Sequence, residues 1–472
     1  MDKKLKKLFS DTAILGFGTF GSKLLVFFLM PFYTAWLSTS QYSTAELITG
    51  TANLIIPLAC VGIANGIFRF AADREQDKKA VFSTSVALLG IGSAVFLVLS
   101  PLLLLIDYFT STVWLIVLYV LSANLQSVAA QYVRAVDRPK LFALQGILNT
   151  LLTVGLNVLF LAVWDMGVVG YVLSVILGNL VTTLFLVIVA RLDRVFSIRA
   201  VDRRLMKELL WFSLPMVPTT VCWLITDLSD RYMVTYFCGD AVNGVYSAAY
   251  KIPTVITLVS SIFMQAWQFS AVAESSDEES CGRFYSDVFR GFLSVIAIGT
   301  AGLIFCSRSL TRLLLNEAYF EAHRYMPTLL CAAALESVVA FLATVYMVKK
   351  KSVHSFLTAI LGTGLNILLN LWLIPQQGLI GGALGAAVAT LAGYGAVLVA
   401  RMIDAPRLIR FRLCLPRLCV SLALLLLEAA VMTFDPPGRL WWALLLTVAV
   451  AAINLPALLK SMRGLLKFRK NS

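Results

Sequence analysis

Long apolar runs recur along the whole chain and are separated by short polar loops. About fourteen of them reach roughly 18–28 residues, enough for an α-helix to cross the hydrocarbon core of a bilayer. They lie near residues 12–36, 44–68, 81–106, 112–133, 141–163, 168–190, 209–236, 245–269, 288–307, 325–348, 353–374, 378–400, 417–434 and 440–459. The pattern predicts an all-α polytopic membrane protein, although Asp435-Pro-Pro-Gly438 could instead cap a re-entrant hairpin made from the last two runs.

The positions of the basic residues support this assignment of spans. Most of the 39 Lys and Arg residues fall in loops on one side of the predicted membrane, including Arg134, the 191–207 segment and Lys349-Lys350-Lys351. Cytoplasmic loops carry such an excess of basic residues. The alternation therefore predicts that both termini lie in the cytoplasm.

The composition excludes several classes of protein. Hydrophobic residues make up 59% of the chain and charged residues 14%, whereas soluble domains carry about 25% charged residues. The net charge of +13 follows the loops and does not indicate nucleic-acid binding. The eight cysteines include no C-x-x-C pair and there are two histidines, so we expect neither a disulfide framework nor a metal site.

Catalysis is also unsupported by the sequence. No Gly precedes a Lys, which excludes a Walker A loop, and no loop is long enough to form a soluble catalytic domain. The G-x-G-x-x-G at Gly16, Gly18 and Gly21 lies inside an apolar span, where small residues serve helix packing. We therefore expect a protein that is not an enzyme, has no cofactor, and carries its function within the membrane.

The two halves of the chain resemble each other. Tyr42-Ser-Thr-Ala resembles Tyr246-Ser-Ala-Ala, and Asn157-Val-Leu resembles Asn366-Ile-Leu. Copies of six helices each enter the membrane from the same side and form parallel repeats, which can rock around a shared groove. The predicted organisation is a six-helix bundle over residues 1–208, a second over 209–408, and two further helices with a basic cytoplasmic tail over 409–472.

Charged residues within the spans are candidate functional residues, because an ionisable group is costly at membrane depth. The first span contains Lys23, and the seventh and eighth contain Asp227, Asp230, Arg231 and Lys251. Asp227 and Arg231, spaced i and i+4, could instead only neutralise each other on one helix face.

The second span adds two weaker candidates. Glu46 lies near its outer end and could be interfacial, and Arg69 lies at its inner end and could be a topological anchor. Glu336 and Glu428, in later spans, are candidates for proton or packing roles. Prolines at 57, 215, 218 and 253 interrupt the second, seventh and eighth spans, and bent helices are tolerated where they line a cavity.

Several of these motifs resemble a known family. The segments Pro215-Met-Val-Pro218, Asp230-Arg231-Tyr232 and Gly244–Pro253, together with Phe68-Arg69-Phe70, resemble the bacterial polysaccharide (oligosaccharide-lipid) flippases. These belong to the multidrug/oligosaccharidyl-lipid/polysaccharide (MOP) exporter superfamily. The resemblance implies two six-helix bundles around a central cavity, a location in the bacterial cytoplasmic membrane, and a role in cell-surface polysaccharide biosynthesis.

The function implied is transfer of an undecaprenyl-pyrophosphate-linked oligosaccharide across the membrane by alternating access. Lys23, Arg69, Arg231 and Lys251 are then expected to bind the substrate, and Glu46, Asp227 and Asp230 are expected to couple a proton or sodium gradient. Partners are the lipid-linked oligosaccharide and membrane lipids, with a glycan polymerase or glycosyltransferases as potential protein partners. The alternatives are a multidrug/cation antiporter or a flippase for lipid II or spore-wall precursors. Short outside loops disfavour a membrane glycosyltransferase or polymerase.

Overall fold

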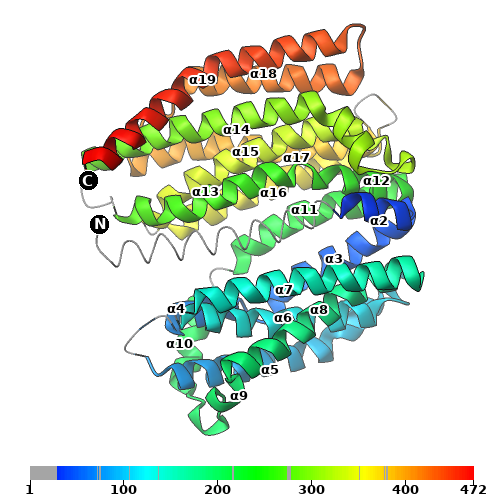
Figure 1. Ribbon diagram of the computed structural model, residues 1–472, viewed down its shortest axis with the longest axis vertical. Coiled ribbons are helices and arrows are strands. Elements are labelled where there is room, and N and C mark those ends of the chain that lie inside the picture. The colour runs from blue at the N-terminus through cyan, green and yellow to red at the C-terminus, as the bar shows by residue number, and fades with distance from the viewer. Residues whose placement is uncertain are drawn as a thin grey trace. The chain divides into compact units, whose positions relative to one another are not determined.

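The computed structural model describes residues 29–71, 73, 76–105, 107–136, 138–214, 217–273, 278–349, 351–376, 378 and 381–471. Within these ranges every regular element is a helix (Figure 1). The chain divides into two compact units. The N-terminal unit ends at Leu228 and the C-terminal unit begins at Ser229.

The N-terminal unit is built around α6 and α8, which pack against each other and against α3 and α7. The 3₁₀ segment Ser100–Leu105 extends α5, and the π-helical segment Val158–Val163 extends α7. The helices of this unit are α2 (Met30–Trp36), α3 (Thr39–Ala59), α4 (Ile63–Ala71), α5 (Lys78–Leu99), α6 (Val113–Ala135), α7 (Pro139–Asn157), α8 (Gly167–Ala190), α9 (Leu192–Val195), α10 (Arg203–Ser213) and the first half of α11 (Val217–Cys238).

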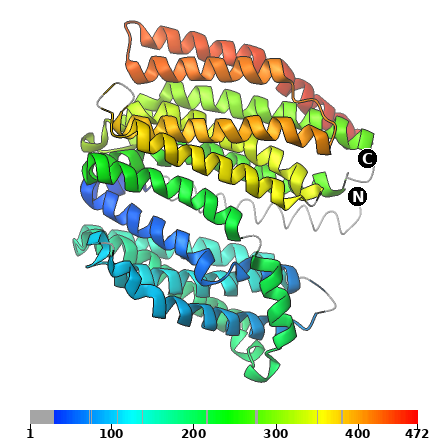
Figure 2. The ribbon, with the colours of Figure 1, turned by 180° about the vertical axis from the view of Figure 1, so that it is seen from behind.

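The C-terminal unit is centred on α15, which packs against α13, α14, α17 and α18. The last two helices, α18 and α19, form a hairpin that lies along α14 (Figures 1 and 2). Besides the end of α11, the helices of this unit are α12 (Asp240–Lys251), α13 (Thr254–Ala273), α14 (Glu278–Leu314), α15 (Ala322–Val348), α16 (Ser352–Leu373), α17 (Gly382–Leu408), α18 (Leu415–Phe434) and α19 (Arg439–Asn471).

These helices confirm the predicted class of a polytopic all-α membrane protein. Among the described residues, eleven helices are long and apolar enough to cross a membrane, and α10 with α11 makes a twelfth if the pair is one span. They correspond to the predicted third to fourteenth spans. Most of the first span lies outside the described residues. α18 and α19 each qualify alone, which favours two spans over a re-entrant hairpin.

The second predicted span is broken into α3 and α4. Pro57 lies inside α3, and the helix ends two residues later at Ala59. Val61 and Gly62 then adopt left-handed backbone conformations, with φ of 50° and 65°. Proline disturbs the turn that precedes it, where α3 is continuous, so the break after Pro57 is made by these two left-handed residues. The backbone N–H of Gly62 donates to the carbonyl of Pro57 at 3.0 Å and closes the end of α3. Ser38 and Gln41 form a capping box at the start of α3.

A small residue allows α5 to approach this break. A Cβ atom added at Gly92 would lie 2.2 Å from the carbonyl oxygen of Ala59, while one added at Gly90 would meet nothing within 4 Å. We expect Gly92→Ala to lower the free energy of unfolding by about 1–3 kcal/mol, as overpacking does. Thermal unfolding of the purified protein measures the change.

Gly90→Ala is the matched control, because it adds the same methyl group to the same helix. It should leave stability unchanged or raise it slightly, since Ala favours helix over Gly. Equal melting temperatures for the two variants would contradict the close packing of α5 against the end of α3.

Candidate functional site

The candidate site lies where α11 and α12 form a helical hairpin. The two helices are joined at Gly239, whose φ of 90° favours glycine. Consecutive residues of α11 contact residues one turn apart on α12: Asp230 contacts Tyr246, and Arg231 lies over the ring of Tyr250. The hairpin therefore places an acidic and a basic side chain side by side.

Asp230 is a buried carboxylate surrounded by hydrogen-bond donors. Asp230 is only 1% exposed. It accepts hydrogen bonds from the Tyr246 hydroxyl at 2.9 Å, the Asn366 amide at 3.0 Å and the Asn370 amide at 2.6 Å. The hydroxyl of Thr390 also donates to it. These partners come from α12, α16 and α17, so four helices meet at one carboxylate.

The surrounding amides are themselves held in place. Asn366 accepts hydrogen bonds from Ser229 and Asn370, both at 3.2 Å. Asn370 Oδ1 is buried without a hydrogen-bond partner among the described residues, which is costly for a polar atom. The Nδ2 atoms of Asn366 and Asn370 face the carboxylate. If these amides turn over, the site presents carboxylate, hydroxyl and amide oxygens, which are ligands that hard cations prefer. Such a group of atoms can hold a proton or a small cation.

Arg231 and Lys251 place positive charge at the same hairpin. Both side chains are half-buried. The guanidinium carbon of Arg231 lies 5.9 Å from the ring centroid of Tyr250, and Lys251 follows Tyr250 at the end of α12. Tyr246 and Tyr250 are in edge contact, with ring centroids 6.1 Å apart. Asp230 and Arg231 are therefore linked through two tyrosines on one face of α12, and Lys251 is the next residue after the second tyrosine.

The N-terminal unit contains the remaining candidates that the structure describes. Glu46 is buried in α3 and accepts a hydrogen bond from the Tyr171 hydroxyl at 3.3 Å. Arg69, at the end of α4, has a side chain 61% exposed and an ion pair with Asp73 at 3.7 Å. Asp227 is half-buried on α11, one turn before Arg231. The exposed position of Arg69 agrees with the anchor alternative as well as with substrate binding.

The structure thus brings Asp230, Arg231 and Lys251 together at one hairpin, and it places Glu46 and Arg69 on α3 and α4 of the other unit. Lys23 lies outside the described residues. The roles assigned to all seven residues remain predictions.

The partners of Asp230 were not predicted from the sequence. Asn366, Asn370 and Thr390 are neutral, so the cost of burying charge did not draw attention to them. One signal was present: Asn366 and Asn370 are spaced i and i+4 within an apolar span, on one helix face. The internal repeat includes two residues of the site. Tyr246 and Asn366 match Tyr42 and Asn157 of the first half, and all four are fully buried.

Glu428 lies in a different environment. It is buried on α18 and accepts a hydrogen bond from Thr447 of α19 at 2.7 Å. Asn454 of α19 donates to Ser421 of α18 at 2.9 Å. These polar contacts join the two terminal helices, which supports the packing role proposed for Glu428.

Known proteins resemble the chain in sequence profile and in fold. Residues 8–268 match the profile of the family described as "Polysaccharide biosynthesis protein", which is more than half of the chain. Among curated proteins, none matches the sequence at a significant level.

Two solved structures illustrate the similarity of fold. An inward-facing multidrug resistance MATE family transporter of the MOP superfamily is similar with a TM-score of 0.67 and 16% identity, over 82% of this chain and 95% of the transporter. The lipid II flippase MurJ, in an inward closed conformation, is similar with a TM-score of 0.68 and 12% identity, over 96% of this chain and 100% of MurJ. At these identities the similarity establishes the fold.

Proposed function

The chain belongs to the polysaccharide biosynthesis protein family, and from this premise we propose that it is a flippase of the MOP superfamily whose substrate is a lipid-linked oligosaccharide. Its substrate would be an oligosaccharide on undecaprenyl pyrophosphate, carried across the bacterial cytoplasmic membrane by alternating access. The product would serve cell-surface polysaccharide biosynthesis, with glycosyltransferases or a glycan polymerase as partners in the pathway.

The buried carboxylate of Asp230 beside Arg231 and Lys251 carries the proposal. A transporter of an anionic substrate needs cations that bind phosphate and, when it is gradient-driven, a group that binds the driving ion reversibly. Arg231 and Lys251 would bind the diphosphate, since charge-assisted hydrogen bonds to phosphate are among the strongest available. Lys23 and Arg69 are the proposed cations from the first half of the chain. The sugar would occupy the polar groove and the prenyl chain would stay in lipid.

The coupling ion would bind at Asp230. A sodium ion would be held by the carboxylate, the Thr390 hydroxyl and the amide oxygens of Asn366 and Asn370, after both amides turn so that Oδ1 replaces Nδ2 beside Asp230. The Oδ1 of Asn370, buried without a partner among the described residues, would then bind the ion. A proton would instead neutralise the carboxylate, which removes the cost of a buried charge. Asp227 and Glu46 are the further candidates for coupling.

Transport in proteoliposomes tests the proposal. We expect a fluorescent undecaprenyl-pyrophosphate oligosaccharide, initially protected from a membrane-impermeant quencher, to become accessible to it when a sodium or proton gradient is imposed. Since the sequence has no Walker A loop, ATP should have no effect, and an ionophore that collapses the gradient should stop transport. Equal rates with and without any gradient would contradict ion coupling.

The choice of substrate separates the proposal from its alternatives. Liposomes of the same preparation would be tested with lipid II and with a fluorescent cationic drug. Transport of the drug but not of the oligosaccharide would identify a multidrug antiporter and overturn the flippase proposal. Preference for lipid II over the oligosaccharide would assign the protein to peptidoglycan precursors instead.

A further inference from the structure

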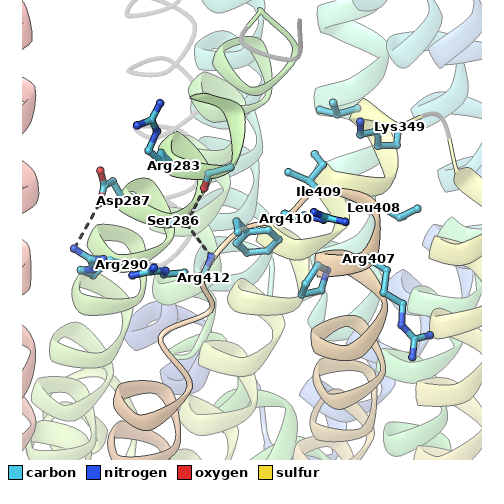
Figure 3. A pocket seen from close by; sticks show the side chains of 14 residues that line it. Arg283, Ser286, Asp287, Arg290, Lys349, Arg407, Leu408, Ile409, Arg410 and Arg412 are labelled. Atoms are coloured by element: carbon cyan, nitrogen blue, oxygen red, sulfur yellow. Dashed lines mark hydrogen bonds and ion pairs between the residues drawn. The ribbon is translucent and has the colours of Figure 1, made fainter. Parts of the chain in front are cut away.

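A cationic cavity of about 1190 Å³ lies in the C-terminal unit, and none of its lining residues belongs to the Asp230 cluster (Figure 3). It is formed by the start of α14, the ends of α15 and α17, and the segment from Ile409 to Cys414 that joins α17 to α18. Among its lining residues Asp287 is the one acid, and its side chain is paired with Arg290 at 3.5 Å. The lining cations are Arg283, Arg290, Lys349, Arg407, Arg410 and Arg412.

The segment from Ile409 to Cys414, here called the strap, presents two of these cations. Ile409, Phe411 and Leu413 are buried, whereas Arg410 and Arg412 are exposed. This alternation is that of an extended chain, in which successive side chains point to opposite sides. Phe411 packs against Tyr285 and Phe289 of α14, with ring centroids 5.6 Å and 6.3 Å away. The apolar face of the strap is thus fixed, and its arginines line the cavity.

The backbone of the strap is also fixed to α14. The Ser286 hydroxyl donates to the carbonyl of Gly282 at 2.7 Å and accepts from the backbone N–H of Arg412 at 2.8 Å. A Cβ atom added at Gly282 would lie 2.1 Å from the carbonyl oxygen of Arg410, so glycine is what permits this approach. The arginine side chains are therefore carried by a backbone that cannot easily move them apart.

Six cations around one cavity repel one another, and a bound anion would relieve this repulsion. An excess of basic residues in cytoplasmic loops explains why arginines occur at this end of the helices. It does not explain why the strap is anchored to α14 so that its two arginines line the same cavity as the other four cations. Guanidinium groups match phosphate oxygens in geometry and charge. Basic pockets at the ends of membrane helices suit lipid phosphates.

We propose that this cavity binds a phosphate group, supplied by the headgroup of an anionic phospholipid or by a free phosphate compound. Its place at the ends of α14, α15 and α17 puts it at the membrane surface, where phospholipid headgroups are concentrated. Phosphate binding at this cavity can be measured without transport, so the proposal does not depend on the flippase function.

Lipid retention by the purified full-length chain tests the proposal. The protein in neutral detergent is incubated with phosphatidylglycerol or phosphatidylcholine, and native mass spectrometry counts the lipid that stays bound. We expect wild type to retain phosphatidylglycerol and not phosphatidylcholine. Each Lys or Arg near an anionic lipid strengthens binding about fivefold. Arg410→Gln/Arg412→Gln should therefore weaken retention about 30-fold.

Inorganic pyrophosphate distinguishes the two sources. Phosphatidylglycerol that excess pyrophosphate does not displace identifies a lipid-headgroup site, and displacement identifies a site that also takes soluble phosphate. Arg410→Lys/Arg412→Lys keeps the charge and should retain most of the lipid. Should the glutamine variant fold poorly, Arg283→Gln/Arg407→Gln removes two cations from the cavity without altering the strap.

The matched control is Arg194→Gln/Arg199→Gln, which removes two exposed cations from the N-terminal unit. It should retain phosphatidylglycerol as wild type does. The proposal is overturned if the cavity variants retain as much lipid as wild type, or if the control loses as much as they do.

Discussion

Replacement of Asp230 by Asn is expected to abolish ion-driven transport while leaving the protein folded. The new side chain keeps the volume of the carboxylate and its Oδ1 can still accept hydrogen bonds. Its NH₂ group can donate to Asn370 Oδ1 once the Asn370 amide, whose Nδ2 now faces residue 230, turns over. The site loses the negative charge needed to attract a cation or take up a proton. We expect the gradient-driven rate to fall by at least about a hundredfold, which corresponds to about 2.7 kcal/mol, in the proteoliposome assay.

Asp230→Ala should also lower the stability of the protein, which Asp230→Asn should not do. It leaves the buried donors of Tyr246, Asn366, Asn370 and Thr390 without their acceptor, and each unsatisfied donor costs about 1–3 kcal/mol. The melting temperature of this variant should therefore fall clearly below that of Asp230→Asn.

Two further measurements make the ion-binding role falsifiable. If sodium is the coupling ion, NaCl should raise the melting temperature of wild type more than KCl does, and Asp230→Asn should lose this difference. Asp193→Asn, at an exposed position on α9, is the matched control and should behave as wild type. Wild-type transport by Asp230→Asn would refute a coupling role for this carboxylate.

Removal of Lys251 is expected to have the next largest effect. A charge-assisted contact to phosphate contributes about 1.5–3 kcal/mol, so Lys251→Ala should weaken substrate binding roughly ten- to a hundredfold and reduce export accordingly. Binding of the labelled undecaprenyl-pyrophosphate oligosaccharide to the purified variant measures this directly. Lys207→Ala, on the exposed side of α10, is the control. Normal binding and export by Lys251→Ala would contradict a diphosphate-binding role for the hairpin.

Arg231 needs a double variant, because it lies one turn from Asp227 on the same helix. Arg231→Ala removes a cation over Tyr250 and can also leave a carboxylate without a counter-ion. If Asp227→Ala/Arg231→Ala restores both folding and export, Arg231 is a structural counter-ion. If it restores folding alone, Arg231 or Asp227 acts in transport.

Much of the fold could be predicted because bilayer thickness dictates the length of apolar runs. Pro57 indicated a bend in the second span, but the break lies after it, at the left-handed residues Val61 and Gly62. The ends of α14 and α19 were not predicted: the apolar runs cover 288–307 and 440–459, but the helices span Glu278–Leu314 and Arg439–Asn471. A helix continues through polar residues as long as its backbone hydrogen bonds are made, and hydropathy does not report that.

The site was predictable only in part, for a related reason. Asp230 is conspicuous because a carboxylate in an apolar span is costly, and this cost can be read from one residue and its neighbours. Its partners Asn366 and Thr390 lie on α16 and α17, 136 and 160 residues further along the chain. A neutral polar side chain in an apolar span can bond to its own helix or to any neighbouring helix, so it does not indicate a particular partner. Which of them would surround Asp230 depends on how the helices pack, which residue types alone do not specify.

The boundary between the two units falls inside α11, between Leu228 and Ser229. Asp230 is therefore anchored to α12, α16 and α17 one residue beyond the point where the helix leaves the N-terminal unit. An α-helix transmits rotation about its axis because every turn is hydrogen-bonded to the next. In the proposed coupling, a change in the hydrogen bonds of Asp230 on ion binding would be transmitted along α11 to the Val217–Leu228 segment, and rotation of that segment would in return alter ion binding, as thermodynamic linkage requires. If an ion binds at Asp230 as proposed, the torsional stiffness of α11 would contribute to the free energy that links ion binding to rotation of the Val217–Leu228 segment.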